Sequence, residues 1–181
     1  MSKTFLTLFD TALGRCGIAW GGNGILSANF PEDTDDRTRQ QLRRRAPEAQ
    51  ETDDVPPRIA SVITAIQALM EGASEDLRDA ELDMTGLGDF EQQLYGLSRQ
   101  IGPGETRSYG DLARDLGDVA FSQRVGQALG RNPFPIIVPC HRVIGANGQM
   151  TGFSAPGGVE TKRQLLKIEG AIERDLFDLM G

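Results

Sequence analysis

Cys140 and His141 stand next to each other in the segment Pro135–Gly145, and His141 is the single histidine among 181 residues. A cysteine attacks as the thiolate, so a nucleophilic cysteine needs a base or a positive charge close by. His141 can supply that base, and Glu169 is a candidate to orient the imidazole, which would complete a Cys/His/acid relay. A core thiol beside a surface histidine would produce the same pair, so the adjacency alone leaves both interpretations open.

The residues before Cys140 must present it to a pocket or an edge. The apolar run Pro135–Val138 predicts a buried, extended segment that ends at Pro139. Neighbouring side chains of an extended chain point to opposite faces, so contact between Cys140 and His141 requires a tight turn or a bridging water.

The composition limits the kinds of site and of location. Cys16 and Cys140 are the two cysteines, and with one histidine they are too few for a structural zinc site, so we expect no metal and no cofactor. No apolar run reaches the roughly 20 residues that span a bilayer, and the first ten residues lack the pattern of a signal peptide. We therefore expect a cytoplasmic protein with no membrane partner, in which Cys16 is a small packing residue.

Charge is distributed unevenly along the chain. The net charge is −7, but residues 1–89 carry 16 acidic and nine basic side chains, whereas residues 90–181 carry ten of each. Residues 119–172 hold six basic and two acidic side chains. The Cys-His segment therefore lies in the locally basic part of an acidic chain, although a chance imbalance of charge explains the difference as well.

The first 30 residues predict a small antiparallel sheet. Thr4–Phe9, Gly14–Trp20 and Gly24–Phe30 have the composition of strands, and the sequence Gly-Gly-Asn-Gly before the third is typical of a hairpin turn.

The rest of the first half predicts one clear helix and a polar connection. The apolar residues of Arg58–Met70 recur at helical spacing, and Gly72 ends that helix. Leu77–Met84 has the composition of one more strand. Residues 31–57 are polar, and we expect a solvated face or loop there, with a short basic helix and a nucleic-acid contact by Arg43–Arg45 as the alternative.

The second half predicts helices over Asp89–Ile101, Ser108–Gly117 and Phe121–Asn132. Ser108 is a plausible N-cap, and Asp111 stands at the third helical position, as a capping box requires. Two short helices joined by a tight turn form a helix-turn-helix, which many proteins use without binding DNA, so this signal is weak by itself.

Several motifs of the second half together resemble one family of DNA-repair proteins. The segment Asn132–Ser154, with Pro-Cys-His-Arg-Val at its centre, closely resembles the active-site signature of the O6-alkylguanine-DNA alkyltransferases. Gly104–Ala113, Arg124–Pro135 and Lys162–Ala171 agree with the same family in the same order. The resemblance covers about Phe90 to Ala171, while the first half agrees only in its general plan.

This resemblance implies a role for each matching residue of the cysteine loop. In the family a cysteine, here Cys140, takes the alkyl group from O6 of guanine irreversibly, so one protein repairs one lesion. His141 would act through a water as the base, Glu169 would orient His141, and Asn132 would tie the helix-turn-helix to the loop.

The resemblance also implies a lesion pocket. Tyr109 would donate a hydrogen bond to the guanine, because guanine leaves poorly until a nitrogen is protonated or hydrogen-bonded. Phe153 would wall the base pocket, and Ser154 would contact O6. Core packing is the alternative interpretation for Tyr109 and Phe153.

Access to a stacked base requires that the nucleotide be flipped out of the duplex. The resemblance implies that the second helix of the helix-turn-helix enters the minor groove and that Arg124 fills the gap in the base stack. We expect Arg124, Ser122 and Gly126 to contact DNA. Arg131 and Arg142 are expected to add to the protein's positive field, with a structural role as the alternative for either. Lys162 and Arg163 are expected on a solvated helix face.

The sequence thus predicts an α+β protein. Residues 1–86 form an N-terminal supporting domain of antiparallel sheet plus helix, and residues 87–181 form a C-terminal helical, winged-helix-like domain with the helix-turn-helix and the cysteine loop. The expected function is DNA repair by a monomer, which transfers a methyl or alkyl group from O6-alkylguanine in double-stranded DNA to Cys140 in a single turnover; O4-alkylthymine stays open as a substrate.

Two other functions remain as alternatives. An alkyltransferase-like protein would bind the lesion without transfer, but Cys140 speaks against it. A helix-turn-helix regulator would read the major groove, but it leaves the Cys-His-Arg segment without a role.

Overall fold

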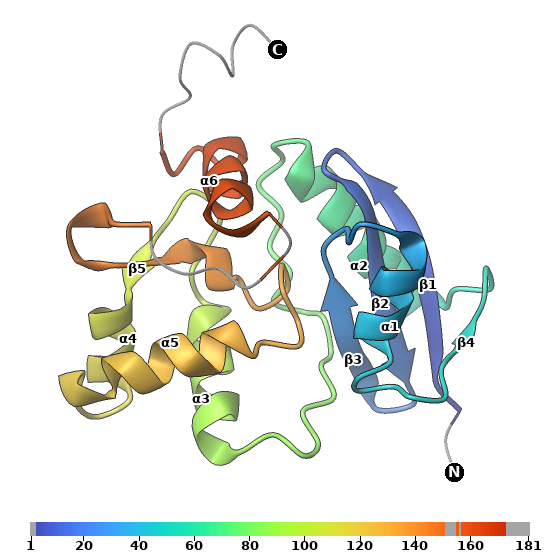
Figure 1. The fold of residues 1–181 in the computed structure, drawn as a ribbon, viewed down its shortest axis with the longest axis horizontal. Helices are drawn as coiled ribbons and strands as arrows, with labels where there is room; N and C mark the ends of the chain where they lie inside the picture. Colours follow the sequence, from blue (N-terminus) through green and yellow to red (C-terminus); the bar gives the residue numbers. More distant parts are fainter. Residues whose placement is uncertain (1–2, 151–154, 156, 173–181) are drawn as a thin grey trace, which may run out of the picture.

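Two parts of the chain lie side by side in the computed structural model, which describes residues 3–150, 155 and 157–172 (Figure 1). The first part is a four-stranded sheet with helices against it, and the second is a group of helices with a two-stranded sheet. This is the α+β class that the sequence predicts. In chain order the helices and strands are β1 (Phe5–Thr11), β2 (Gly14–Gly21), β3 (Gly24–Asn29), α1 (Asp35–Leu42), β4 (Gln50–Glu51), α2 (Pro57–Met70), α3 (Asp89–Ser98), β5 (Arg107–Ser108), α4 (Tyr109–Asp115), α5 (Ser122–Gly130), β6 (Val143–Ile144) and α6 (Gly158–Ile168).

The large sheet has the strand order β3-β2-β1-β4. β1 and β2 pair antiparallel from Phe5 opposite Trp20 to Thr11 opposite Gly14, and β3 pairs antiparallel with β2. The predicted hairpin turn connects β2 to β3. β4 pairs parallel with β1 and was not predicted, because two residues are too few to show a strand pattern.

Successive side chains of a strand point to opposite faces of the sheet, and here both faces carry apolar side chains. On one face Phe9, Ile18 and Trp20 belong to the main core together with the buried side of α2. On the other face Leu6 and Ala19 pack in a smaller cluster under α1. The sheet is thus covered on both faces, rather than followed by a single helix.

The helix α1 confirms the alternative of a short helix in residues 31–57 in place of the preferred loop. Thr34 caps the helix by accepting a hydrogen bond from the backbone N–H of Arg37, and acidic side chains occupy the first turn. Its buried residues are Thr38 and Leu42, one helical turn apart, which is too short an apolar stripe to stand out in a polar sequence. Gly17 of β2 makes room for this helix, because a Cβ there would lie 2.6 Å from Leu42 Cδ1.

The helices of the second part follow the prediction closely. Ser108 and Asp111 form the expected capping box at the start of α4, and a short 3₁₀ turn, Val119–Phe121, leads into α5. α4 and α5 make up the helix-turn-helix. The small sheet pairs β5 with β6 in parallel and so joins the start of α4 to the segment just after the cysteine. The strand expected at Leu77–Met84 is reduced to one bridge between Ile25 and Leu82.

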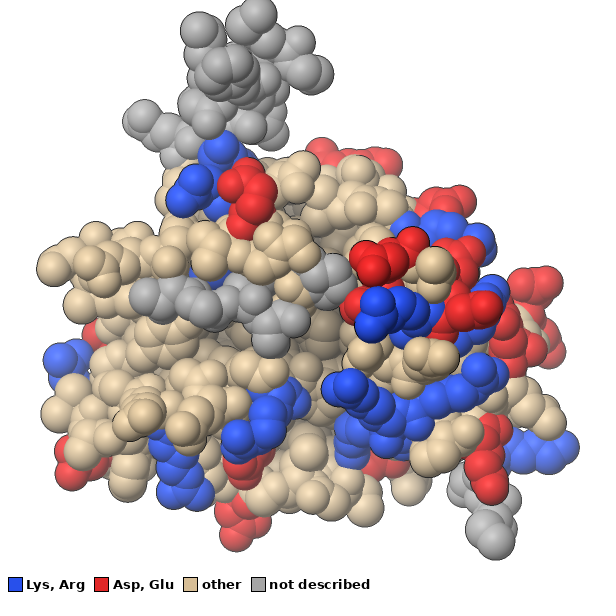
Figure 2. Space-filling view, viewed as in Figure 1, with Lys and Arg blue, Asp and Glu red and all other residues tan. Residues whose placement is uncertain are grey.

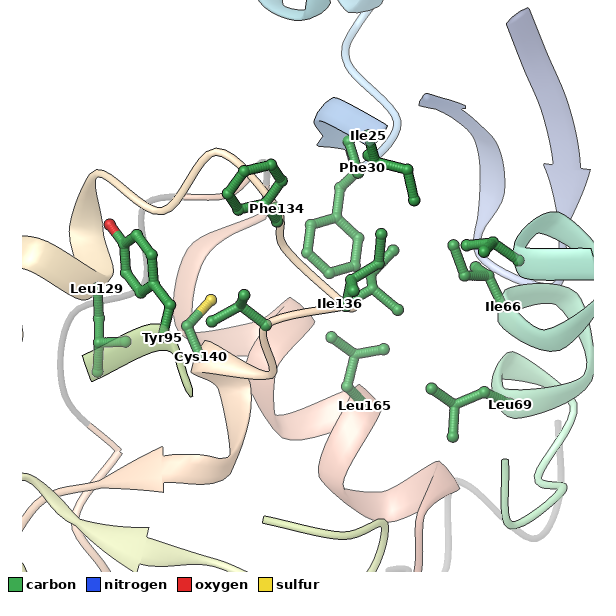
Figure 3. Close-up of a cluster of buried hydrophobic side chains, with 14 of the residues drawn as sticks. Ile25, Phe30, Ile66, Leu69, Tyr95, Leu129, Phe134, Ile136, Cys140 and Leu165 are labelled. Atoms are coloured by element: carbon green, nitrogen blue, oxygen red, sulfur yellow. The ribbon is translucent and has the colours of Figure 1, made fainter. Parts of the chain in front are cut away.

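A single buried cluster connects the two parts. Figure 3 shows side chains from the first part, such as Phe30 and Ile66, beside Phe134, Ile136 and Leu165 from the second. A backbone hydrogen bond of 2.9 Å from Ala28 N to Pro133 O crosses between them. The first part therefore supports the loop that leads to Cys140, while a domain boundary between residues 86 and 87 stays a prediction.

Candidate active site

Cys140 begins a 3₁₀ turn, Cys140–Arg142, and not the end of an extended run. Backbone hydrogen bonds of 2.8 Å from Val138 N to Phe134 O and from Cys140 N to Val138 O fold the preceding residues into a compact loop. Ile136 has a φ of 78°, which is a costly conformation for a β-branched residue and needs firm support from its surroundings. The buried apolar character of this run was predicted correctly, but its extended shape was wrong.

The thiol of Cys140 lies at the edge of the apolar core, with 9% of the residue exposed, and Figure 3 shows its sulfur near Tyr95 and Phe134. Burial raises the pKa of the Cys140 thiol above its ordinary value, while a hydrogen bond with Asn132 and the charge of Lys162 act in the opposite direction. The residue therefore rests as a neutral thiol at pH 7 and needs a base before it can attack.

His141 has a carboxylate on one side and, among the residues that the structure describes, no hydrogen-bond partner on the other. Its Nε2 lies 3.1 Å from both carboxylate oxygens of Glu169. Because a carboxylate only accepts hydrogen bonds, Nε2 carries the hydrogen and Nδ1 is left with a lone pair. Nδ1 is buried and finds no hydrogen-bond partner among the described residues. Burial lowers the pKa of His141 below its ordinary value, so the imidazole is neutral and Nδ1 is free to accept a proton.

Glu169 is held from a second side by Arg142. The Arg142 Nε and Nη2 atoms donate to the two carboxylate oxygens at 3.0 and 2.6 Å, and its Nη1 donates to Ile101 O at 2.6 Å. Burial alone would raise the pKa of Glu169, but hydrogen bonds from His141 and Arg142 outweigh it and bring the pKa to about 2. Arg142 is 5% exposed, so the alternative of a structural role is supported over the expected contribution to the positive field, and that role is to hold the carboxylate.

Asn132 connects α5 to the cysteine loop. Its Nδ2 donates to Val138 O and its Oδ1 accepts from Phe134 N, both at 2.9 Å. The two hydrogen bonds fix both ends of the turn that precedes Cys140. These contacts agree with the resemblance, which implies that Asn132 ties the helix-turn-helix to the cysteine loop.

Lys162 of α6 was predicted to lie on a solvated helix face, and this prediction was wrong. It is fully buried, and its Nζ donates to Val143 O at 2.5 Å and to the Tyr109 hydroxyl at 3.4 Å. The ammonium also lies 5.6 Å from the centre of the Tyr109 ring. Helical spacing could have revealed it, because residue 162 lies two turns before Glu169 on the same face of α6. Arg163, the next residue, is exposed as expected.

The helix-turn-helix carries the remaining expected contacts. Arg124 is exposed on α5, and its guanidinium lies 3.9 Å from the centre of the Phe90 ring. Arg131 follows α5, and its Nη2 lies 3.5 Å from Oε1 of Glu91 on α3, which makes an ion pair. Ser122 donates to Val119 O at the start of α5.

Gly126 of α5 lies beside Tyr109, where a Cβ would be 3.9 Å from the ring. This is an ordinary van der Waals distance, so Gly126 and Tyr109 are neighbours without crowding. Phe153 and Ser154, which we expect in the lesion pocket, lie outside the described residues.

A cleft of about 550 Å³ leads to the cysteine. Its walls come from β3 and α1 in the first part and from the end of α5 and the cysteine loop in the second, and Cys140 lies in its lining. Within residues 3–150, 155 and 157–172, no group of three or more His, Cys, Asp or Glu side chains is placed to hold a metal ion. No helix in the same part of the chain is long and apolar enough to cross a bilayer.

Comparison with known proteins agrees with this geometry. Residues 89–171 match the DNA-binding domain of 6-O-methylguanine DNA methyltransferase. A methylated-DNA–protein-cysteine methyltransferase of Mycobacterium tuberculosis is 36% identical over 160 residues, which are 88% of each chain. The chain belongs to the 6-O-methylguanine DNA methyltransferase family.

Other members of the family extend the comparison to the whole chain. A methylated-DNA–protein-cysteine methyltransferase of Haemophilus influenzae is 31% identical over 169 residues, 93% of this chain and 88% of that one. The crystal structure of Mycobacterium tuberculosis OGT in complex with DNA is 34% identical, with a TM-score of 0.73 over 92% of this chain and 93% of that chain. The first part therefore belongs to the family fold as well, although its sequence resembles the family less clearly.

Proposed function

We propose that this protein repairs DNA by moving a methyl or alkyl group from O6 of guanine to Cys140, once per molecule. Family membership gives the reaction class, since relatives across the chain are named methylated-DNA–protein-cysteine methyltransferases. The observation that carries the assignment to this site is the arrangement of Cys140 and His141 on one 3₁₀ turn, with the imidazole fixed by Glu169 so that its buried Nδ1 can accept a proton.

The proposed transfer is a displacement at the alkyl carbon. A water between the thiol and His141 Nδ1 passes the thiol proton to the imidazole, because a thiol with a raised pKa does not ionise without a base. The Cys140 sulfur then forms a bond to the alkyl carbon, and the bond from that carbon to O6 breaks with its electron pair remaining on the guanine. The Glu169 carboxylate stabilises the imidazolium that forms.

The guanine that leaves must gain a proton, and in this proposal Tyr109 supplies it. Lys162 donates to the Tyr109 oxygen, so the phenolic hydrogen remains available to a ring nitrogen of the base. As that hydrogen moves to the base, the ammonium 3.4 Å away stabilises the negative charge left on the phenol oxygen. The charges then balance, because the thiol proton is on the His141 imidazolium, the guanine holds the Tyr109 proton, and a return of the imidazolium proton to the phenolate through solvent restores both side chains.

The depth of the cysteine requires a flipped nucleotide. A thiol at the edge of the core cannot reach a base that is stacked inside a duplex, and flipping costs a few kcal/mol. The exposed Arg124 of α5 would fill the gap in the stack, with α5 in the minor groove, where the small residues Ser122 and Gly126 allow a close approach. We further propose that the protein acts as a monomer on double-stranded DNA in the cytoplasm.

The test measures binding of the lesion separately from transfer of the alkyl group. In the Cys140→Ala variant we expect no transfer from a duplex with one O6-methylguanine, and a retained preference for that duplex over plain DNA, because other residues build the pocket. Continued transfer by the variant would contradict the assignment of the nucleophile. Preference without transfer in the unaltered protein would favour a lesion-binding function, and preference for one defined operator sequence would favour a regulator.

A further inference from the structure

The wall of the cleft opposite the helix-turn-helix is basic, although the first half of the chain is acidic. This wall contributes Arg44 and Arg45, which follow α1, and the facing side contributes Arg131 after α5. Among the described residues of the lining, Glu32 is the single acidic side chain. In Figure 2, blue side chains gather on both sides of the hollow between the two parts of the molecule. The nucleophile Cys140 lines the same cleft.

Two of the three consecutive arginines after α1 are used within the fold. Arg43 donates to Ala49 O at 3.0 and 3.3 Å. Arg45 donates to Leu26 O, Asp83 O and Thr85 O at 2.7 to 2.8 Å, and its guanidinium carbon lies 5.4 Å from the centre of the Phe134 ring. Arg43 and Arg45 therefore hold the backbone together, which leaves them few hydrogens for a ligand.

Arg44 differs from both neighbours. It is exposed on the cleft, and its guanidinium has no hydrogen bond or ion pair with any described residue. Glu32, the acidic residue of the lining, already accepts a hydrogen bond of 2.9 Å from Asn29. Gln41, one helical turn before Arg44, lines the same wall and adds amide hydrogens. The guanidinium of Arg44 can thus donate two parallel hydrogen bonds to an anion that enters the cleft, and its positive charge attracts that anion.

We propose that Arg44, supported by Gln41, binds a backbone phosphate of the lesion-bearing strand next to the flipped nucleotide. This contact rests on the proposed function, because a nucleotide that rotates out of a duplex toward Cys140 carries its flanking phosphates to the mouth of this cleft. A guanidinium there offsets their mutual repulsion and neutralises one phosphate charge. The DNA contact then extends from the helix-turn-helix to the first part of the chain.

The experiment compares Arg44→Gln with a matched variant, Arg37→Gln. Both remove one exposed charge from the region of α1, but Arg37 pairs with Asp33 and does not line the cleft. Methyl transfer is measured under second-order conditions from an O6-methylguanine duplex and from O6-methylguanine as the free base, over a range of KCl concentrations. Equal melting temperatures of the two variants establish that both are folded.

For Arg44→Gln we expect the slope of log rate against log salt on duplex to become shallower by about 0.9, which is a loss of about fivefold at 0.15 M salt relative to 1 M. Transfer from the free base should not change, and Arg37→Gln should follow the unaltered protein on both substrates. An unchanged slope, or an equal loss on duplex and free base, would overturn the phosphate contact. If the unaltered protein transferred from neither substrate, the proposed function would fail instead, and the salt slope of equilibrium binding to the duplex would still test Arg44.

Discussion

The guanidinium of Arg124 stacks on the ring of Phe90, with its central carbon 3.9 Å from the ring centre. Phe90 is itself held edge-on by Phe121, at a centre distance of 5.9 Å and an angle of 82°. The side chain proposed to enter the base stack is thus bound to α3 in the DNA-free protein. Because Arg124 cannot occupy both places, this cation–π contact must break when the nucleotide flips.

Phe90→Leu should therefore favour the flipped state. Loss of a cation–π contact of about 0.5–1 kcal/mol shifts the flipping equilibrium by about two- to fivefold, as read from the fluorescence of 2-aminopurine placed beside the lesion. In an Arg124→Ala background the same change at Phe90 should have no effect, because the contact is already absent. Equal shifts in both backgrounds would show that Phe90 acts on flipping by another route.

The buried Lys162 should matter for the rate of transfer more than for binding. In Lys162→Gln the positive charge near the Tyr109 oxygen and the Cys140 thiol is lost, while a polar group remains for Val143 O. We expect single-turnover transfer at saturating DNA to fall by about 100- to 1000-fold, the range for loss of one preorganised electrostatic group. Arg163→Gln, one position later on the exposed side of α6, is the matched control and should leave the rate unchanged. A fall in affinity with no change in the saturating rate would argue against the role of Lys162.

Local patterns predicted most of the elements, but the burial of Lys162 on α6 was missed because its residue type was given more weight than its helical spacing from Glu169. The capping box of α4 and the apolar stripe of α2 are short-range signals, and both are present in the structure. Lys162 was predicted to be solvated because lysine is rarely buried, and only the approach of Tyr109 and Val143 from other elements provides its partners.

Long-range contacts also explain why the structural role of Arg142 and the helix α1 were alternatives and not the first interpretation. Arg142 follows the nucleophile directly and has the charge of a DNA contact, but its partners Ile101 and Glu169 lie 41 and 27 residues away in the sequence. α1 has few apolar residues, and its packing depends on the missing side chain of Gly17 in a neighbouring strand. The roles of the catalytic residues came from resemblance, because residue types alone left the Cys-His pair ambiguous.

Glu169 should contribute strongly to stability. In Glu169→Gln the buried charge of Arg142 loses its counter-ion, and we expect a loss of about 3–5 kcal/mol in the free energy of unfolding, measured by urea denaturation with an unchanged m-value. Glu160→Gln is the control, because Glu160 forms an exposed pair with Arg163 and should cost less than about 1 kcal/mol.

The effect of Glu169 should also depend on pH in one direction. Its folded pKa of about 2 lies below the ordinary value of 4.5, so the ionised carboxylate stabilises the fold fully above pH 4.5, and this stabilisation is lost as the pH falls toward 2. The difference in the free energy of unfolding between the unaltered protein and Glu169→Gln, measured by denaturant titration at each pH, should shrink from pH 4.5 to pH 2. A difference that stayed constant from neutral pH down to pH 2 would contradict the depressed pKa.

The rate of alkyl transfer should not fall when the pH is lowered from neutral to mildly acidic values. Burial lowers the pKa of His141, so the imidazole stays neutral and able to accept the thiol proton below the ordinary histidine value of 6.5. We expect the single-turnover rate at saturating duplex to stay level as the pH falls to about 6.5 and to decline only below it. A rate that was already halved at or above that pH would mean that His141 is not a base with a lowered pKa.

The most direct measurement is the intact mass of the protein after incubation with a duplex that contains one O6-methylguanine. The proposed function predicts a gain of one methylene, about 14 Da, limited to one per chain and located by peptide mapping on Cys140. An unchanged mass under conditions where the protein binds the lesion, or a gain located on another residue, would contradict methyl transfer to Cys140.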